Sequence, residues 1–147
     1  MNPRKQNACI CIVILGLLLA VPLTVKAGQD LPSIILDGLN EYKAKGPDAA
    51  VKTWIKGSAF ETSVEAQSQG NLFKQVETMY GKYIGYQIVK MKEITKTTMA
   101  VYITMDYEKG PVFASFLTYR SGDSSILANF KFNTKPEAVL PDSLLSQ

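Results

Sequence analysis

Alternating apolar and polar residues between positions 83 and 134 predict a run of β-strands. In residues 98–107 every second side chain is apolar: Met99, Val101, Ile103, Met105 and Tyr107. Because successive side chains of a strand point to opposite faces of a sheet, this pattern predicts a strand with one buried face. Turn-forming residues divide the rest of the stretch, at 108–111 and at 121–124. The pattern therefore predicts four consecutive antiparallel strands.

The same pattern predicts a register for the last three strands. The apolar sets are Phe113, Leu117 and Tyr119, followed by Ile126, Ala128, Phe130 and Phe132. These sets share the buried face if Tyr119 lies opposite Ile126. A three-residue turn with Gly110 in the left-handed region would then place Met105 opposite Phe113.

In this register the outer face of the sheet carries a band of apolar residues. Tyr102 lies opposite Phe116 and Thr104 opposite Ala114, with Leu127 nearby. Such residues are either scattered surface side chains, which are common, or a surface through which two copies of the chain associate. The candidate dimer-interface residues are Tyr102, Ala114, Phe116 and Leu127.

The pattern leaves the orientation of the first strand open. Val89 and Met91 face the core in one arrangement, and Ile84, Tyr86 and Ile88 face it in the other. The neighbouring lysines favour the first arrangement, unless a β-bulge switches faces midway along the strand.

Three helices are predicted before the strands. Apolar residues at spacings of three and four predict helices over residues 31–45, from Pro47 to the residue before Gly57, and over about 61–80. Gly70 lowers the stability of the third helix by up to about 1 kcal/mol relative to Ala, which predicts a kink or a break near it. After the strands, two prolines predict an extended tail from about residue 134.

The first 27 residues have the features of a signal peptide. Arg4 and Lys5 precede an apolar run over residues 8–21, and residues 25–27 form a small-residue cleavage site. The run is shorter than the roughly 20 apolar residues that span a bilayer, so we expect cleavage before Gly28 rather than a retained anchor. The sequence thus predicts an exported protein, periplasmic or secreted, with no stable membrane span after cleavage.

Residues 28–147 have a length suited to one α+β domain. Their composition limits the catalytic and metal-binding groups that this domain can use. Both cysteines, Cys9 and Cys11, lie in the predicted signal peptide, and the chain has no histidine. Thiolate and imidazole are thus excluded as nucleophiles, bases or metal ligands. Removal of the three basic residues before Gly28 lowers the formal net charge from +3 to zero, which argues against a nucleic-acid partner. No catalytic residue, metal site or cofactor is predicted.

Aromatic residues at helical and strand spacing provide the candidate ligand site. They are Trp54, Tyr42, Tyr80, Phe113, Tyr119 and Phe130. These residues form either an ordinary core or the wall of an apolar pocket between helices and sheet, and each buried tyrosine hydroxyl needs a partner.

Two pairs of charged residues are weaker candidates. Asp106 and Arg120 fall on the outer face near strand ends, where a solvated or interface role is expected. Glu61 and Glu65 lie one turn apart on the predicted third helix, but the chain offers no His or Cys to complete a metal site with them.

Three stretches resemble small secreted members of the nuclear transport factor 2-like (cystatin-like cone) superfamily. They are residues 80–83 at the helix–strand junction, 110–113 at the start of a strand and 130–133 at the end of the sheet. The resemblance implies three helices packed on a curved four-stranded antiparallel sheet, a cone-shaped pocket between them, and frequent dimerisation through the outer sheet face. Enzymes of the superfamily usually use Asp and His in the pocket. This chain has no His, and the predicted register places no Asp on the inward face of the sheet, so no catalytic residue carries over.

Three functions fit the sequence. The leading hypothesis is an exported, non-catalytic homodimer that binds a small apolar ligand or a partner protein of the cell envelope. The alternatives are an isomerase-like or hydrolase-like enzyme that uses a pocket tyrosine or carboxylate, and a structural accessory protein with a filled core.

Overall fold

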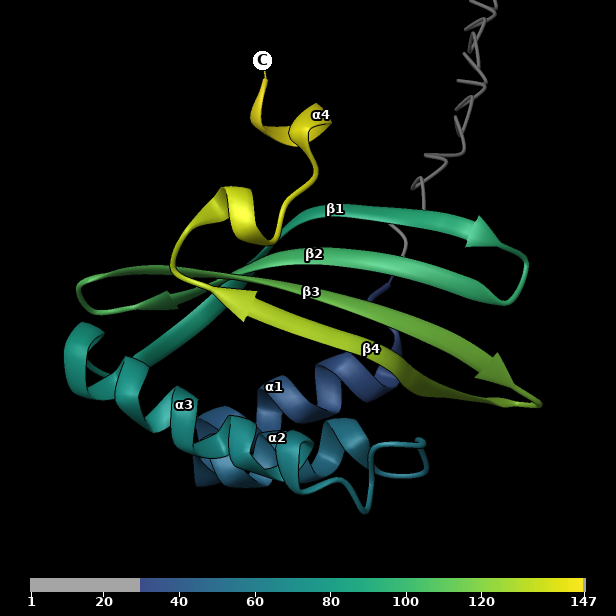
Figure 1. Ribbon diagram of the computed structural model, residues 1–147, viewed down its shortest axis with the longest axis horizontal. Coiled ribbons are helices and arrows are strands. Elements are labelled where there is room, and N and C mark those ends of the chain that lie inside the picture. Colours follow the sequence, from purple (N-terminus) through teal and green to yellow (C-terminus); the bar gives the residue numbers. More distant parts are fainter. Residues whose placement is uncertain (1–29, 147) are drawn as a thin grey trace, which may run out of the picture.

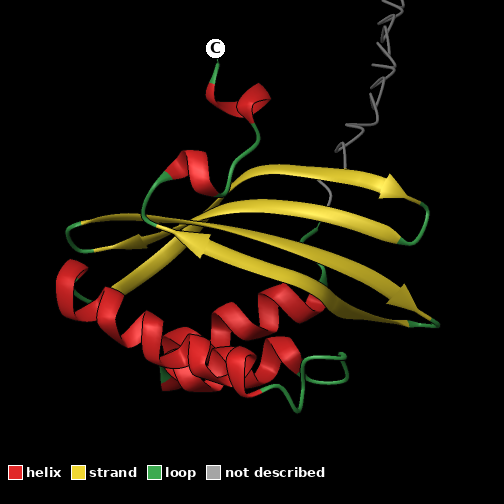
Figure 2. Cartoon of the chain, in the orientation of Figure 1, coloured by secondary structure: helices red, strands yellow, loops and turns green. Residues whose placement is uncertain are grey.

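The computed structural model describes residues 30–146 as three helices packed on one face of an open, four-stranded antiparallel sheet (Figure 1). The elements that make up these layers are α1 (Ser33–Lys45), α2 (Pro47–Ile55), α3 (Val64–Tyr80), β1 (Tyr83–Thr95), β2 (Thr98–Tyr107), β3 (Gly110–Ser121) and β4 (Ser124–Asn133). Figure 2 shows α1, α2 and α3 on one side of the sheet, and the short helical turns near the C-terminus on the other. The predicted α+β class is confirmed, whereas the predicted signal peptide lies outside the described residues.

The helices begin and end at residues that favour helix termini. Gly46 alone separates α1 from α2, with a φ of 90° that glycine adopts without strain. Pro47 then opens α2, at a position where no amide hydrogen is needed. Ser63 caps α3 by accepting a hydrogen bond from the amide of Ala66, so this helix starts later than predicted.

Gly70 lies inside α3, which is continuous where the sequence predicts a kink or a break. It is buried against the start of α2, where an added Cβ would overlap the Asp48 carboxylate and lie 3.3 Å from the Asp48 Cα. Lys74, one turn further along α3, forms an ion pair with Asp48. The missing side chain therefore allows α2 and α3 to approach each other closely.

The strands are hydrogen-bonded in the order β1-β2-β3-β4. The inward face of β2 is as predicted, because Val101, Ile103, Met105 and Tyr107 are all buried. The predicted register of β3 is wrong by one residue, since Met105 lies opposite Val112 rather than Phe113. A shift of one residue turns every side chain of a strand to the other face. The β3 residues that face the helices are Val112, Ala114, Phe116 and Thr118.

The β2–β3 turn explains this error. It has two residues, Glu108 and Lys109, because Tyr107 pairs with Gly110. Two-residue hairpin turns usually need left-handed residues, and no non-glycine residue of the described chain has a positive φ. The amides of Lys109 and Glu108 donate instead to the carbonyls of Tyr80 and Lys82, at 2.9 and 3.2 Å. The junction of α3 and β1 thus holds the turn in place.

A β-bulge also changes the face of β4. Tyr119 lies opposite Ile126, as predicted, but the register shifts between Leu117 and Thr118 of β3. Ala128 is the extra residue on β4, and it is exposed rather than inward as predicted. The bulge lets Leu127 and Phe130 both face the helices although they are three residues apart.

Three register shifts bend β1, and each leaves one apolar residue without a partner on β2: Ile84, Val89 and Ile94. Tyr86 and Ile88 precede the bulge at Val89 and lie opposite the inward residues of β2. Met91 follows the bulge and also lies opposite an inward residue, Val101. The first strand therefore switches faces midway, which is one of the arrangements that the sequence leaves open.

Trp54 lies at the centre of the core. Its indole is fully buried and donates a 3.2 Å hydrogen bond to the carbonyl of Ile35 in α1. An added Cβ on Gly38 would overlap the indole ring, so α1 packs against Trp54 only because this position has no side chain. Other large, fully buried side chains are Phe73, Phe116, Ile35, Leu39, Ile103, Met105, Leu127, Val101 and Val112.

The C-terminal segment, residues 134–146, folds back over the sheet on the side opposite α1, α2 and α3 (Figure 1, yellow). It contains a 3-10 helix, η1 (Pro136–Ala138), and one turn of helix, α4 (Asp142–Leu145), so the predicted extended tail is wrong. Between these elements, Val139 and Leu140 are only 9% and 7% exposed. Their burial shows that the segment packs against other residues of the chain instead of extending into solvent.

Candidate functional site

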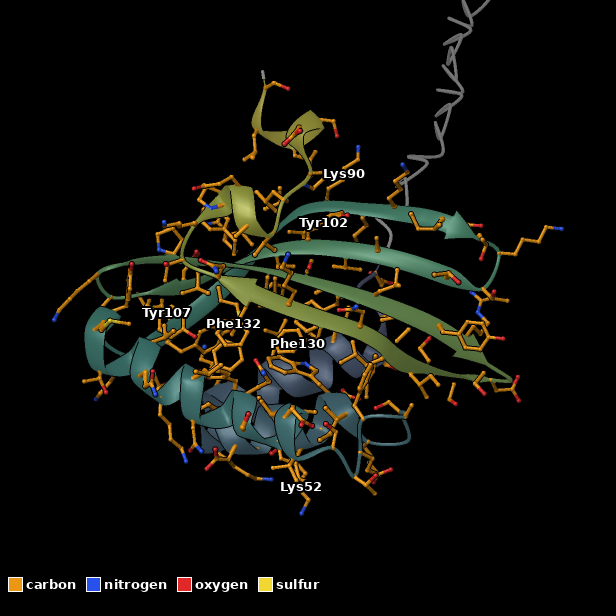
Figure 3. The ribbon with its side chains drawn as sticks, viewed as in Figure 1. Lys52, Lys90, Tyr102, Tyr107, Phe130 and Phe132 are labelled. Carbon is orange, nitrogen blue, oxygen red and sulfur yellow. The ribbon has the colours of Figure 1, made fainter. Side chains whose placement is uncertain are left out.

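Stacked aromatic rings fill the space between helices and sheet, where the sequence places a ligand pocket. The Phe73 ring of α3 stacks on Phe132 of β4, with centroids 3.9 Å apart. Phe130 lies 5.1 Å from Trp54 and 4.9 Å from Phe116, measured between ring centroids. Figure 3 shows Phe130 and Phe132 pointing from the sheet toward the helices. These rings pack as an ordinary aromatic core.

The structure brings four of the six predicted pocket residues to the core. Trp54 and Tyr42 belong to it, and Phe130 and Tyr80 pack against it. Tyr80 is half-buried at the end of α3, next to Gly110. Phe113 lies on the outer sheet face because of the register shift, and Tyr119 is 45% exposed near the end of β3. The six residues therefore do not line one cavity.

Three tyrosines from different elements form a cluster in the core: Tyr42 of α1, Tyr83 of β1 and Tyr107 of β2. The hydroxyl of Tyr107 donates a 3.1 Å hydrogen bond to the hydroxyl of Tyr42. Burial raises the pKa of all three phenols above the ordinary value, and the nearby Tyr107 and Glu77 raise the pKa of Tyr42 further. The hydroxyls thus stay protonated at neutral pH.

The sequence interpretation missed the roles of Tyr83 and Tyr107. Tyr107 was placed on the inward face, but its hydroxyl partner lies on a helix that is distant in the sequence. The available signal was a residue with a polar tip at a position predicted to be buried, because such a hydroxyl requires a partner. Both rings complete the packing around Tyr42, at centroid distances of 4.6 Å for Tyr83 and 6.4 Å for Tyr107.

The glutamate pair of the predicted third helix has a structural role. The carboxylate of Glu61 accepts a 2.9 Å hydrogen bond from the amide of Gly57, in the loop before α3. The hydroxyl of Ser63 donates to Glu65 at 2.8 Å, and backbone and Ser63 hydrogen bonds hold the pKa of Glu65 below its usual value. These contacts order the loop and the first turn of α3.

Asp106 and Arg120 lie near opposite ends of the sheet and do not form a pair. Asp106 accepts a 2.8 Å hydrogen bond from the side-chain amide of Gln87 on the neighbouring strand. Arg120 is exposed at the end of β3, and its backbone amide donates to Thr97. Within residues 30–146, no three His, Cys, Asp or Glu side chains gather as metal ligands.

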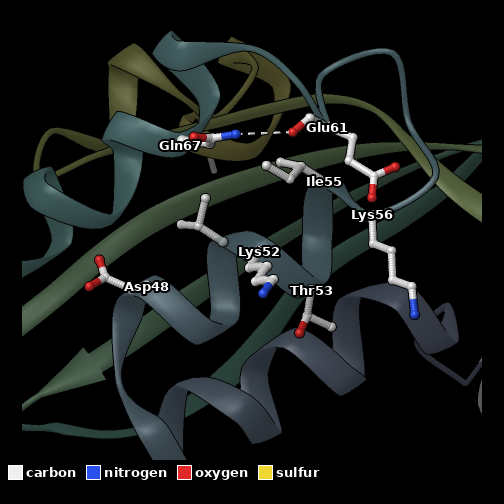
Figure 4. A pocket seen from close by; sticks show the side chains of 8 residues that line it. Asp48, Lys52, Thr53, Ile55, Lys56, Glu61 and Gln67 are labelled. Carbon is white, nitrogen blue, oxygen red and sulfur yellow. Dashed lines mark hydrogen bonds between the residues drawn. The ribbon is translucent and has the colours of Figure 1, made fainter.

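A groove with a volume of about 690 Å³ opens on the helical layer (Figure 4). Its lining comes from α2, the following loop and α3, and consists of Asp48, Val51, Lys52, Thr53, Ile55, Lys56, Glu61 and Gln67. The amide of Gln67 donates to the backbone carbonyl of Glu61 at 3.2 Å. The groove is open to solvent and its lining mixes charged with apolar side chains, unlike the enclosed, mostly apolar sites that bind most small molecules.

The outer sheet face carries a smaller cavity of about 250 Å³, which is lined by Ala100, Tyr102, Ser115, Phe116, Leu117, Asn129 and Lys131. Of the four predicted dimer-interface residues, Tyr102 lies on this face. Ala114, Phe116 and Leu127 belong to the core under the helices, because of the β3 register and the β4 bulge. Phe113 and Leu117 take their places on the outer face.

Comparisons of this chain with protein-family models, with curated proteins and with solved structures found no match. In the part of the chain that the structure describes, no helix is long and apolar enough to cross a membrane. Any proposal for the function of this chain therefore rests on the sequence and on the geometry of the described residues.

Proposed function

We propose that the chain is an exported, non-catalytic protein that acts by binding a partner protein of the cell envelope. The observation that supports this function is the packed interior, in which Phe73, Phe130 and Phe132 stack between the helices and the sheet. A site for a small molecule usually needs a cavity of roughly 300–1,000 Å³ that encloses most of the ligand. With the interior filled by side chains, recognition takes place at the surface.

The buried polar groups also favour a non-catalytic role over an isomerase-like or hydrolase-like one. A catalytic acid or base must lie within hydrogen-bonding reach of its substrate. Tyr42 and Tyr107 are almost completely buried, and their hydroxyls bond to each other. Their polar groups thus serve the packing of the core, as in an accessory protein with a filled interior.

Export and membership of the nuclear transport factor 2-like superfamily are part of this proposal. The pattern of residues 1–27 supports export to the periplasm or the medium. Helices on one face of the sheet and three bulges in β1 support a curved, cone-like fold. In this chain, side chains would occupy the pocket that the superfamily resemblance implies.

Native mass spectrometry of the exported protein, purified from its host, tests the absence of a small ligand. We expect the mass of the polypeptide alone. A small apolar compound that co-purifies at one molecule per chain would contradict the proposal, because the interior would then hold a ligand.

Site-specific photocrosslinking in the host tests for the partner protein. A photoreactive residue replaces Lys52 in the groove of α2 and α3 in one variant, and Leu117 on the outer sheet face in another. Replacement of Lys96, in the exposed β1–β2 turn, is the matched control. We expect one envelope protein to crosslink from one of the two surfaces but not from the control position. Equal yields from all three positions would indicate non-specific contact.

A further inference from the structure

The outer sheet face is partly occupied by the chain itself. The C-terminal segment lies on it, and Val139 and Leu140 are the buried residues of that segment. The flanking elements η1 and α4 contain no buried residue. Contact between the segment and the rest of the protein thus depends mainly on two adjacent apolar side chains.

Hydrogen bonds within the described residues tie the C-terminal segment only to itself and to the end of β4. The amides of Val139 and Leu140 donate to the carbonyl of Pro136, at 2.9 and 2.7 Å. The amide of Lys135 donates to the side chain of Asn133 at 2.9 Å. A segment with so few bonds to the body of the protein opens at a low free-energy cost.

The outer sheet face has an apolar strip with basic borders. The strip consists of Ala100, Tyr102, Phe113 and Leu117. On the β1 side, Lys90 lies opposite Tyr102 and Lys92 lies opposite Ala100. On the β4 side, Lys131 lies opposite Ser115. Figure 3 shows Lys90 and Tyr102 on the side of the C-terminal segment.

The lysines at these borders are available for a partner. They are exposed, and the ion pairs found within residues 30–146, Lys45–Glu41 and Lys74–Asp48, do not include them. A second copy of the same face would bring like charges together, which disfavours a symmetric sheet-to-sheet contact. A partner with acidic residues would be attracted instead.

The C-terminal segment has this complementary chemistry. Its two buried apolar residues, Val139 and Leu140, lie between Glu137 and Asp142, whose side chains are exposed. Opposite charges orient a segment on a surface and favour its encounter with that surface. The segment thus combines an apolar pair with flanking acidic side chains, the chemistry that suits an apolar strip bordered by lysines.

We propose that the outer sheet face is a docking site for a partner segment in which two adjacent apolar residues lie between acidic residues, and that the C-terminal segment blocks this site. The partner must displace residues 134–146. Its apparent affinity is therefore its affinity for the open site multiplied by the fraction of chains in which the site is open. This inference rests on the proposed function, since it names the surface and the chemistry by which a partner protein is recognised.

The test is a titration of residues 28–147 with a synthetic peptide of residues 134–147, followed by the amide resonances of Tyr102 and Leu117. In Leu140→Asp the chain's own segment no longer covers the face, and we expect the peptide to shift both resonances. The wild-type chain should need at least about 10-fold more peptide for the same shift, because its own segment competes. Raising the salt from about 50 to about 300 mM should weaken binding, because the lysine–carboxylate attraction is screened.

Two matched controls accompany this titration. A peptide that itself carries Leu140→Asp should cause no shift, and a Leu145→Asp chain, altered at an exposed position of α4, should behave like the wild type. If circular dichroism shows that Leu140→Asp is unfolded, Leu140→Ala is used instead. For this milder variant we expect a smaller increase in peptide affinity over the wild type.

Three results would overturn the proposal. The first is the absence of shifts in a folded variant, and the second is equal binding by variant and wild type. The third is dimerisation of the Leu140→Asp chain without peptide binding, which would assign the face to a second copy. A partner that crosslinks from Lys52 would leave the proposed function standing even if this docking site fails.

Discussion

The indole of Trp54 lies directly against the backbone of Gly38. An added Cβ at this glycine would overlap the Nε1, Cδ1 and Cε2 atoms of the ring. The same indole donates its N–H to the carbonyl of Ile35, almost one turn earlier in α1. The glycine and the tryptophan together set how closely α1 and α2 pack.

Replacement of Gly38 by Ala should destabilise the fold. The new methyl group has no room unless α1 or the indole moves, and such overpacking typically costs about 1–3 kcal/mol. The control is Gly85→Ala in β1, where an added Cβ meets no atom within 4 Å. Urea unfolding should show a lower midpoint for Gly38→Ala alone. Equal midpoints for the two variants would show that the helices adjust without cost.

Phe116 and Phe113 should differ strongly in their contribution to stability. Phe116 is 1% exposed and packs against Trp54, so Phe116→Ala should lower the free energy of unfolding by about 3–5 kcal/mol. Phe113 lies half-buried on the outer face, and Phe113→Ala should cost clearly less. If denaturant unfolding shows a larger loss of stability for Phe113→Ala than for Phe116→Ala, Phe113 faces the core, as the register predicted from the sequence has it.

The protein should lose stability at high pH because Tyr42 and Tyr107 have raised pKa values in the folded state. Tyrosines of the unfolded chain ionise near about pH 10. Unfolding therefore releases protons above that pH, and the free energy of unfolding falls as the pH rises. The double variant Tyr42→Phe/Tyr107→Phe should show a shallower fall in melting temperature between about pH 9 and 12. Tyr119→Phe, at an exposed position, should keep the wild-type slope, and an unchanged slope in the double variant would contradict this assignment.

The mature amino terminus is predicted to be Gly28, from the small-residue site at 25–27. Intact-mass measurement of the exported protein should give the mass of residues 28–147. A mass that includes residues 1–27 would indicate a retained anchor instead.

The sequence predicts the helices and β2 well because only one face of each is strongly apolar. In β3 both faces are apolar: Phe113 and Leu117 alternate with Val112, Ala114 and Phe116. The pattern alone does not choose between them. The choice of Phe113, Leu117 and Tyr119 as the inward residues set the predicted register and required a three-residue turn. The actual turn is stabilised by Tyr80 and Lys82, which no local rule for hairpins takes into account.

The candidate site was predictable in part. Trp54 and Tyr42 are buried as their helical spacing predicts, but the same spacing does not distinguish a pocket from a filled core. The C-terminal segment was missed because its prolines favour an extended chain. The adjacent apolar residues Val139 and Leu140 were the available signal that part of this segment is buried.

The β2–β3 turn also has a consequence for the order of folding. A hairpin with a favourable turn of its own closes within roughly microseconds. In this turn, however, the amides of Glu108 and Lys109 donate to the carbonyls of Lys82 and Tyr80, outside the hairpin. Closure of this hairpin must therefore wait for a contact across the intervening chain, which is entropically more costly than a local turn. A peptide that contains only β2 and β3 should pair in several registers, since it lacks the carbonyls of Tyr80 and Lys82 that hold the native turn.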